Sequence, residues 1–306
     1  MKRMAIGVLG VALVALVAAG CATTRPPQFS DEVWISHVTT GRGCFARGDF
    51  RRGADAFGRA QSRARALDDA EALAVASVDR AVCLLQLGRA AEALGGVEEA
   101  LAEGGVSGAR RQELQAAGAR AELALGQPEA VLARTEELLK EKLAPRVQGQ
   151  ALLARAGAEL ALMDVSAAER TLAGLSLAAW RRLPGSLRAE RAELEARLAA
   201  ILEAPDSALA WQQRAIELWR EAGRLPEMAR ALAAAGRYAR ATGNPTLASD
   251  CFWRSARSLW AQGLAEDAAA MLEEGRICAA FSQDEAASQR MADLLVTIRG
   301  EKRLEE

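Results

Sequence analysis

The chain has 306 residues, of which 26% are charged, and a formal net charge of −1. A balance this close to neutrality excludes binding of nucleic acid or another polyanion through bulk positive charge. Apolar residues make up 51% of the chain but aromatic residues only 4%, which favours thin alanine and leucine helix packing over a deep core.

The first residues have the layout of an export signal. Two basic residues precede an apolar run from Met4 to Val17, and small residues lead to Cys21. This segment resembles the signal peptide of bacterial lipoproteins, although Ala18 stands where that family usually carries leucine. The resemblance implies that residues 1–20 are removed and that Cys21 is acylated, with palmitate as a typical chain. An uncleaved signal anchor, or cleavage elsewhere that leaves a plain buried cysteine, stays open.

Residues 21–33 are predicted to be a tether, because Pro26 and Pro27 favour an extended backbone and no apolar period is present. By the usual bacterial sorting rule, Ala22 after the lipidated cysteine indicates the outer membrane. The lipoprotein resemblance therefore predicts a lipid-anchored chain in the cell envelope that faces the periplasm.

The rest of the chain carries evenly spaced turn residues. Each closes one apolar helical stretch and precedes another, at intervals of 37 to 40 residues: Gly48, Gly88, Gly126, Met163, Glu203, Gly243 and Ser282. This period is typical of a stacked array of helical hairpins. Helix-ending residues also mark the joints between units: Gly104, Gly105, Gly108, Pro145, Pro184, Gly185, Gly223, Pro226 and Gly263. Within units, Asp49, Asp164, Asp206 and Asn244 stand where N-caps belong.

Small residues recur inside each unit. With Gly48 counted as position fifteen, position eight is always glycine or alanine: Gly41, Ala81, Ala119, Ala156, Ala196, Gly236 and Gly275. Position twenty-four is larger in most units: Phe57, Val97, Leu172, Phe252 and Met291. Small residues let the two helices approach closely, and the larger ones fill the neighbouring gap.

This pattern resembles the tetratricopeptide repeat over residues 34–301, followed by a short tail at 302–306. The resemblance implies an all-α, right-handed superhelical solenoid of about seven helical hairpins. The period exceeds the usual 34 residues, so we expect a longer second helix or a longer joint. A HEAT-like array is the alternative.

Catalytic chemistry has little support in the sequence. His37 is the only histidine, which excludes a histidine-based zinc site, and no metal or cofactor is predicted. Glu122 and Glu159 occupy equivalent positions and are interpreted as charges on solvated helix faces, because neither has an acid–base partner. The chain is therefore predicted not to be an enzyme.

Four cysteines follow Cys21: Cys44, Cys83, Cys251 and Cys278. The default interpretation is that all four are small unpaired hydrophobic residues. Cys251 and Cys278 are the best candidate pair for a disulfide, because a turn at Gly263 and Leu264 places them level on antiparallel helices.

In tetratricopeptide arrays the first helices line a concave groove. Position nine, which the resemblance turns into that groove, is rich in arginine: Arg42, Val82, Arg120, Gly157, Arg197, Arg237 and Arg276, with Arg230 and Arg240 nearby. The N-terminal groove positions are mostly apolar and include Phe45, Val82 and Leu85. Either these residues bind a partner, or the arginines pair with groove glutamates such as Glu113, Glu190 and Glu193 and cover apolar surface with their stems.

We therefore expect a non-catalytic adaptor that holds a protein partner in its groove and serves the assembly of envelope complexes. Its expected partner segment is acidic at one end and apolar at the other, and contact with the membrane is through the lipid. The alternative is a regulatory protein whose superhelix responds to a peptide or a small anion.

The lipid anchor can be tested directly, because acylation requires the thiol of Cys21. Cys21→Ser should abolish incorporation of labelled palmitate and leave the precursor unprocessed on a gel. Labelling that persists in the variant would refute the lipoprotein interpretation.

Overall fold

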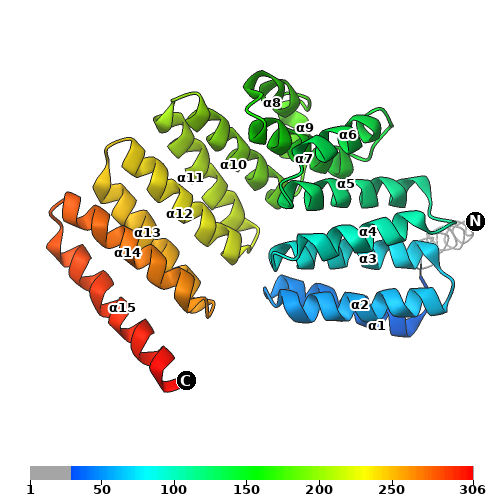
Figure 1. Cartoon of the computed structure of the whole chain (residues 1–306), viewed down its shortest axis with the longest axis horizontal. Helices are drawn as coiled ribbons and strands as arrows, with labels where there is room; N and C mark the ends of the chain where they lie inside the picture. The colour runs from blue at the N-terminus through cyan, green and yellow to red at the C-terminus, as the bar shows by residue number, and fades with distance from the viewer. Residues whose placement is uncertain (1–28, 306) are drawn as a thin grey trace, which may run out of the picture.

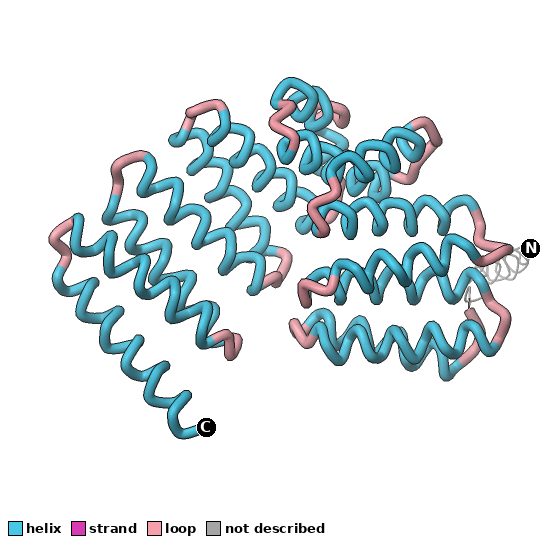
Figure 2. The backbone as a smooth tube through the Cα atoms, viewed as in Figure 1, coloured by secondary structure: helices cyan, strands magenta, loops and turns pink. Residues whose placement is uncertain are grey.

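The structure of the protein is a computed structural model that describes residues 29–305. The export signal, Cys21 and most of the predicted tether lie outside the described residues. Within the described range the chain contains only helices and connecting loops (Figure 2).

The helices pair into hairpins that stack side by side into a curved array (Figure 1). In chain order the described helices are α1 (Glu32–Ala46), α2 (Phe50–Ala66), α3 (Ala70–Gln86), α4 (Ala90–Ala102), α5 (Gly108–Ala124), α6 (Pro128–Leu139), α7 (Pro145–Ala161), α8 (Val165–Leu172), α9 (Leu177–Arg181), α10 (Gly185–Ile201), α11 (Pro205–Glu221), α12 (Leu225–Ala241), α13 (Pro245–Ala261), α14 (Ala265–Phe281) and α15 (Glu285–Glu305). Seven hairpins result, with α9 as an extra helix after the fourth. This confirms the predicted all-α solenoid.

The turn inside each hairpin contains one residue in the left-handed backbone region. These residues are Gly48, Gly88, Gly126, Met163, Glu203, Gly243 and Gln283. Six of the seven predicted positions are therefore confirmed, and the last is wrong by one residue because Gln283 (φ 57°) adopts this conformation instead of Ser282. Such a conformation costs a residue with a side chain roughly 1–2 kcal/mol, so glycine suits most of these turns.

Side-chain caps fix the start of several second helices. Asp49, Asp164 and Asn244 each accept a hydrogen bond from a backbone N–H in the first turn, at 3.2, 3.0 and 3.0 Å, as predicted. The prediction for Asp206 is wrong, because Ala204 is the N-cap of α11 and Asp206 lies inside the first helical turn.

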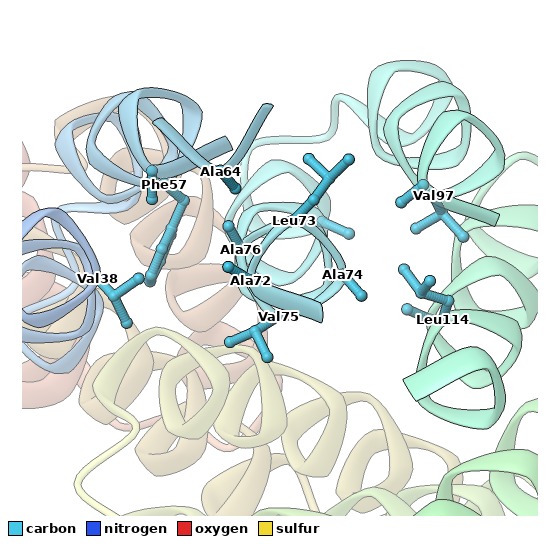
Figure 3. Close-up of a cluster of buried hydrophobic side chains, with 14 of the residues drawn as sticks. Val38, Phe57, Ala64, Ala72, Leu73, Ala74, Val75, Ala76, Val97 and Leu114 are labelled. Atoms are coloured by element: carbon cyan, nitrogen blue, oxygen red, sulfur yellow. The ribbon is translucent and has the colours of Figure 1, made fainter. Parts of the chain in front are cut away.

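Close helix approach depends on the glycines at position eight. A Cβ atom at Gly41 would lie 2.7 Å from the ring of Phe57, and one at Gly275 would lie 2.7 Å from the sulfur of Met291. Phe57 is almost completely buried and points from α2 toward Val38 of α1 (Figure 3). The predicted pairing of a small residue with a large one across each hairpin is confirmed in these units.

Two deviations explain the long period. The second helices α2, α11 and α13 each have 17 residues, which confirms the expected lengthening. The fourth hairpin differs, because α8 has only 8 residues and the 5-residue α9 follows it. Trp180 of α9 is buried in a cluster with Leu160 and Leu172, so α9 fills the space that a longer α8 would occupy. The sequence analysis did not anticipate this helix.

The repeat domain is longer at both ends than predicted. Asp31 caps α1 by accepting the N–H of Trp34 at 2.8 Å, and it also accepts two hydrogen bonds from Arg63. The ring of Phe29 lies 4.4 Å from the ring of Trp34. At the other end, α15 continues to Glu305, through most of the segment that was predicted to be a tail.

Two glycine-to-alanine changes separate helix propensity from packing. Gly95 in α4 has open space around its Cβ position, so Gly95→Ala should stabilise the fold by about 0.5–1 kcal/mol. Gly41→Ala gains the same propensity but drives a methyl group into the buried ring of Phe57, so we expect a net loss of about 1–3 kcal/mol. Denaturant unfolding measures both, and stabilisation by Gly41→Ala would contradict the close-packing argument.

Candidate functional site: the concave groove

The first helices of successive hairpins line two adjoining cavities. The first cavity has a volume of about 500 Å³ and is lined by residues of α1, α3, α5, α7, α10 and α12, with Trp219 from α11. The second has a volume of about 330 Å³ and is lined by α3, α5, α7 and α10. Four residues line both cavities: Arg120, Gln150, Glu190 and Glu193. The two cavities therefore form one continuous groove.

The groove contains most of the residues expected there from the repeat pattern. Arg42, Phe45, Val82 and Arg120 line the first cavity, and Leu85, Arg120 and Arg197 line the second. Arg237 and Arg240 of α12 and Arg276 of α14 are exposed and lie outside both cavities. The structure thus brings the N-terminal and central part of the predicted site together, whereas the C-terminal arginines are not part of either cavity.

Some groove arginines are paired with carboxylates. Arg42 contacts Asp79 at 2.9 Å, Arg120 contacts Glu190 at 2.8 Å, and Arg240 contacts Glu274 at 2.7 Å. For these three, the alternative of internal pairing describes what the structure contains. Their Coulomb energy is modest where the side chains are exposed to solvent.

Other arginines have no ion pair in the part of the chain that the structure describes: Arg197, Arg237 and Arg276. The charges of Arg197 and Arg237 both act on the phenol of Tyr238, where burial has the larger effect and raises its pKa. Arg197 of α10 and Arg237 of α12 are therefore close to the same side chain. Their guanidinium groups are available for an external anion.

An apolar wall faces Arg197 in the second cavity. Leu85, Leu123, Leu153 and Leu194 come from four successive first helices. Gly157 makes room for this wall, because a Cβ atom there would lie 2.7 Å from Cδ2 of Leu123. The glycine that interrupts the arginine column at position nine therefore has a packing role.

Glu193 lies where the two cavities meet. Its Oε1 accepts a hydrogen bond of 3.1 Å from Nε1 of the buried Trp219. Burial raises the pKa of Glu193 from 4.5 to about 7, and the nearby carboxylates of Glu190 and Glu227 add to this effect; the Trp219 bond and the charge of Arg230 oppose it. This carboxyl group consequently changes its charge near neutral pH.

Trp219, Arg224 and Arg146 also line the first cavity, and sequence reasoning did not find them. Trp219 belongs to a second helix, whereas Arg224 stands in a joint between hairpins. The repeat pattern assigns neither position to the groove. No local sequence signal could have found them.

The interpretation of Glu122 and Glu159 as solvated charges is wrong, because both are buried. Glu122 accepts two hydrogen bonds from Arg134, and Glu159 accepts one from Arg155 at 2.9 Å. Both glutamates stand at position eleven, the same packing position as Cys44. Their burial therefore follows from the repeat, and the arginines neutralise the charges.

All four cysteines of the described residues carry free, buried thiols. The candidate Cys251–Cys278 disulfide is not formed in the structure. Cys251 packs among residues of α10, α11 and α12, whereas Cys278 packs against Ala239, Ala248 and Phe252. Burial raises the pKa of Cys251 to about 11, which keeps this thiol protonated and unreactive at neutral pH.

Two searches of the described residues returned nothing. No group of three or more His, Cys, Asp or Glu side chains is placed to hold a metal ion. Among the same residues no helix is both long and apolar enough to span a membrane.

Comparison with known proteins adds a likeness of fold. The sequence matches no protein-family model and no curated protein sequence. The structure is similar to a tetratricopeptide repeat protein from Parabacteroides merdae ATCC 43184, at 15% identity and a TM-score of 0.45, over 86% of this chain and 100% of that one. It is also similar to the TPR2AB-domain:pHSP90 complex of yeast Sti1, at 16% identity and a TM-score of 0.35, over 87% and 98% of the two chains. At these scores the assignment as a tetratricopeptide-like solenoid rests on the hairpins and their close packing.

The titration of Glu193 predicts a pH-dependent stability. Its pKa is raised in the folded state, so its favourable contribution is complete below about pH 4.5 and is lost as the pH rises to about 7. Glu193→Gln still accepts the Trp219 N–H and carries no charge, so at pH 8 it should be more stable than the wild type by up to about 3 kcal/mol. Unfolding curves at several pH values measure this.

The matched control is Glu169→Gln on the exposed face of α8, which should leave the pH profile unchanged. If wild type and Glu193→Gln lose the same stability between pH 4.5 and 8, the carboxyl group does not titrate as described.

Proposed function

We propose that the protein is a non-catalytic, membrane-tethered periplasmic adaptor that holds a segment of a protein partner in its concave groove during assembly of an envelope complex. The observation that carries this proposal is the second cavity, where an apolar wall adjoins arginines without carboxylate partners among the described residues. This arrangement offers a place for an apolar side chain next to an acidic one.

The apolar part of the groove supplies affinity. Burial of one leucine-sized partner side chain against Leu85, Leu123 and Leu153 is worth about 1.5–3 kcal/mol. The cavity volume of about 330 Å³ has room for such a side chain. Because the wall is built from successive hairpins, the binding surface follows the path of the groove rather than a single helix.

The charged part supplies orientation. Arg197 stands at the second cavity, and Arg237 stands near it on the next first helix. A guanidinium group binds a carboxylate through two parallel hydrogen bonds, which fixes the direction of the bound chain. A partner segment with Asp or Glu beside a large apolar residue satisfies both parts of the site.

The location of this adaptor rests on the sequence of residues 1–28. The lipobox-like run before Cys21 and the following prolines support export and a lipid anchor on the outer membrane. A tethered groove searches only the layer next to the membrane, which raises its effective concentration for an envelope partner.

A ligand-responsive regulator is the second candidate. The first cavity favours it, because its volume of about 500 Å³ falls within the range of small-molecule sites. A small anion that raises the melting temperature without any protein partner would support this function over the adaptor. Enrichment of one defined protein by the groove would support the adaptor.

A random library of 12-residue peptides displayed on phage tests the binding chemistry with the chain from residue 22. The selected peptides should combine Asp or Glu with a nearby large apolar residue, and their affinity should fall as salt rises. Changing Arg197, Arg237 and Arg276 together to Gln should weaken a selected synthetic peptide by about tenfold or more, which corresponds to about 1.4 kcal/mol, in fluorescence polarisation.

The matched control changes three exposed arginines on second helices to Gln: Arg59, Arg170 and Arg290. It removes the same charge and should leave the affinity within about twofold, because its positions lie outside the groove. Equal weakening by the two triple variants, or selected peptides without acidic residues, would contradict the proposed groove.

A further inference from the structure

Two side-chain contacts join hairpins that are distant in the sequence. The guanidinium of Arg224, at the start of α12, lies 4.5 Å from the ring centroid of Phe45 and 6.0 Å from that of Phe50. Nη2 of Arg230 donates a hydrogen bond of 3.2 Å to Oε1 of Gln86 in α3. The first two hairpins and the sixth therefore touch across the concave groove.

These contacts differ from the packing that builds the solenoid. In a repeat array each unit packs on its sequence neighbours, so the overall curvature is set by many small and independent rotations. Contacts between the sixth hairpin and the first two lie outside this scheme. They fix the distance between two parts of the chain whose relative position would otherwise vary with those rotations.

The Arg224 contact is well enclosed but incompletely satisfied. Only 19% of the Arg224 side chain is exposed, and it also pairs with Glu227, which is buried. Oε2 of Glu227 has no hydrogen-bond partner among the described residues. A buried oxygen without a partner is unfavourable, so the closed arrangement holds by a small margin.

We propose that Arg224 and Arg230 with Phe45, Phe50 and Gln86 form a latch that holds the solenoid closed across its concave groove, and that release of this latch opens the groove. The first cavity is lined by residues from both sides of the latch, including Phe45, Gln86, Arg224 and Arg230. Its size therefore depends on whether the latch is closed.

The latch has a consequence for the partner that rests on the proposed function. A ten-residue helix is about 15 Å long and about 10 Å across, so it displaces on the order of 1,200 Å³. The two cavities measure about 500 and 330 Å³. The closed groove thus admits an extended segment, whereas a helix enters only after the latch opens.

Distance measurement by electron spin resonance tests the latch without any ligand. Nitroxide labels at Ser62→Cys on α2 and Ser207→Cys on α11 occupy exposed positions on the two sides of the groove, while the native cysteines of the described chain are buried. The latched protein should give one narrow distance distribution. An open state that is populated at about 1–10% before the change should become the major state in Arg224→Ala, with a longer and broader distribution.

Two further variants separate the latch from a folding defect. Phe45→Leu keeps an apolar side chain but removes the ring face, so it should broaden the distribution as Arg224→Ala does, whereas Arg224→Lys keeps the cation and should restore the narrow one. Circular dichroism should be unchanged in all of them. Arg214→Ala, which removes the exposed i,i+3 pair with Glu217 on α11, is the matched control and should leave the distance as in the wild type.

The latch is overturned if neither Arg224→Ala nor Phe45→Leu changes the distance distribution. It is overturned equally if Arg214→Ala changes the distribution as much as Arg224→Ala does. Because no peptide is needed, these outcomes are independent of whether the groove binds an acidic and apolar segment.

Discussion

The structure depends on the exchange of side-chain volume between the two helices of each hairpin. Where one helix carries glycine, the other carries a large side chain that fills the space, as Phe57 does at Gly41 and Met291 does at Gly275. This close approach sets the spacing of the two helix axes. Every later feature, including which faces of the first helices remain open, follows from it.

Hairpins that pack in this way form a thin layer rather than a deep core. The buried residues fall into separate clusters along the array, and alanine dominates the fully buried positions. Each unit therefore depends chiefly on its neighbours. The same architecture leaves the first helices free to supply Leu85, Leu123 and Leu153 to one continuous wall, which is why binding surface and core can be built from the same few elements.

Part of the candidate site could be predicted because the repeat fixes which face of a helix points into the groove. Arg42, Arg120 and Arg197 stand at one position of successive units and all line a cavity. The pattern failed for Arg276, which lies outside both cavities. It could not find Trp219 or Arg224, since these residues reach the first cavity from a second helix and from a joint, and their position depends on the curvature of the whole array.

The treatment of buried charge shows the same division. The repeat placed Cys44, Glu122 and Glu159 at one packing position, yet residue type alone made the glutamates look solvated. Only the structure shows Arg134 and Arg155 beside them. Arg134 reaches Glu122 from the neighbouring helix α6, so spacing along α5 carries no information about that partner.

The sequence by itself determined the helical class, the number of hairpins and the place of nearly every turn. These features depend on interactions between residues that are close along the chain: the period of small and large side chains, the left-handed turn residues and the N-caps. Only the tertiary structure decided how far the array curls, which arginines find carboxylates, and that Arg224 meets Phe45. The physical reason is that small rotations between neighbouring hairpins add up over the length of the array, so contacts between distant hairpins depend on all the units between them.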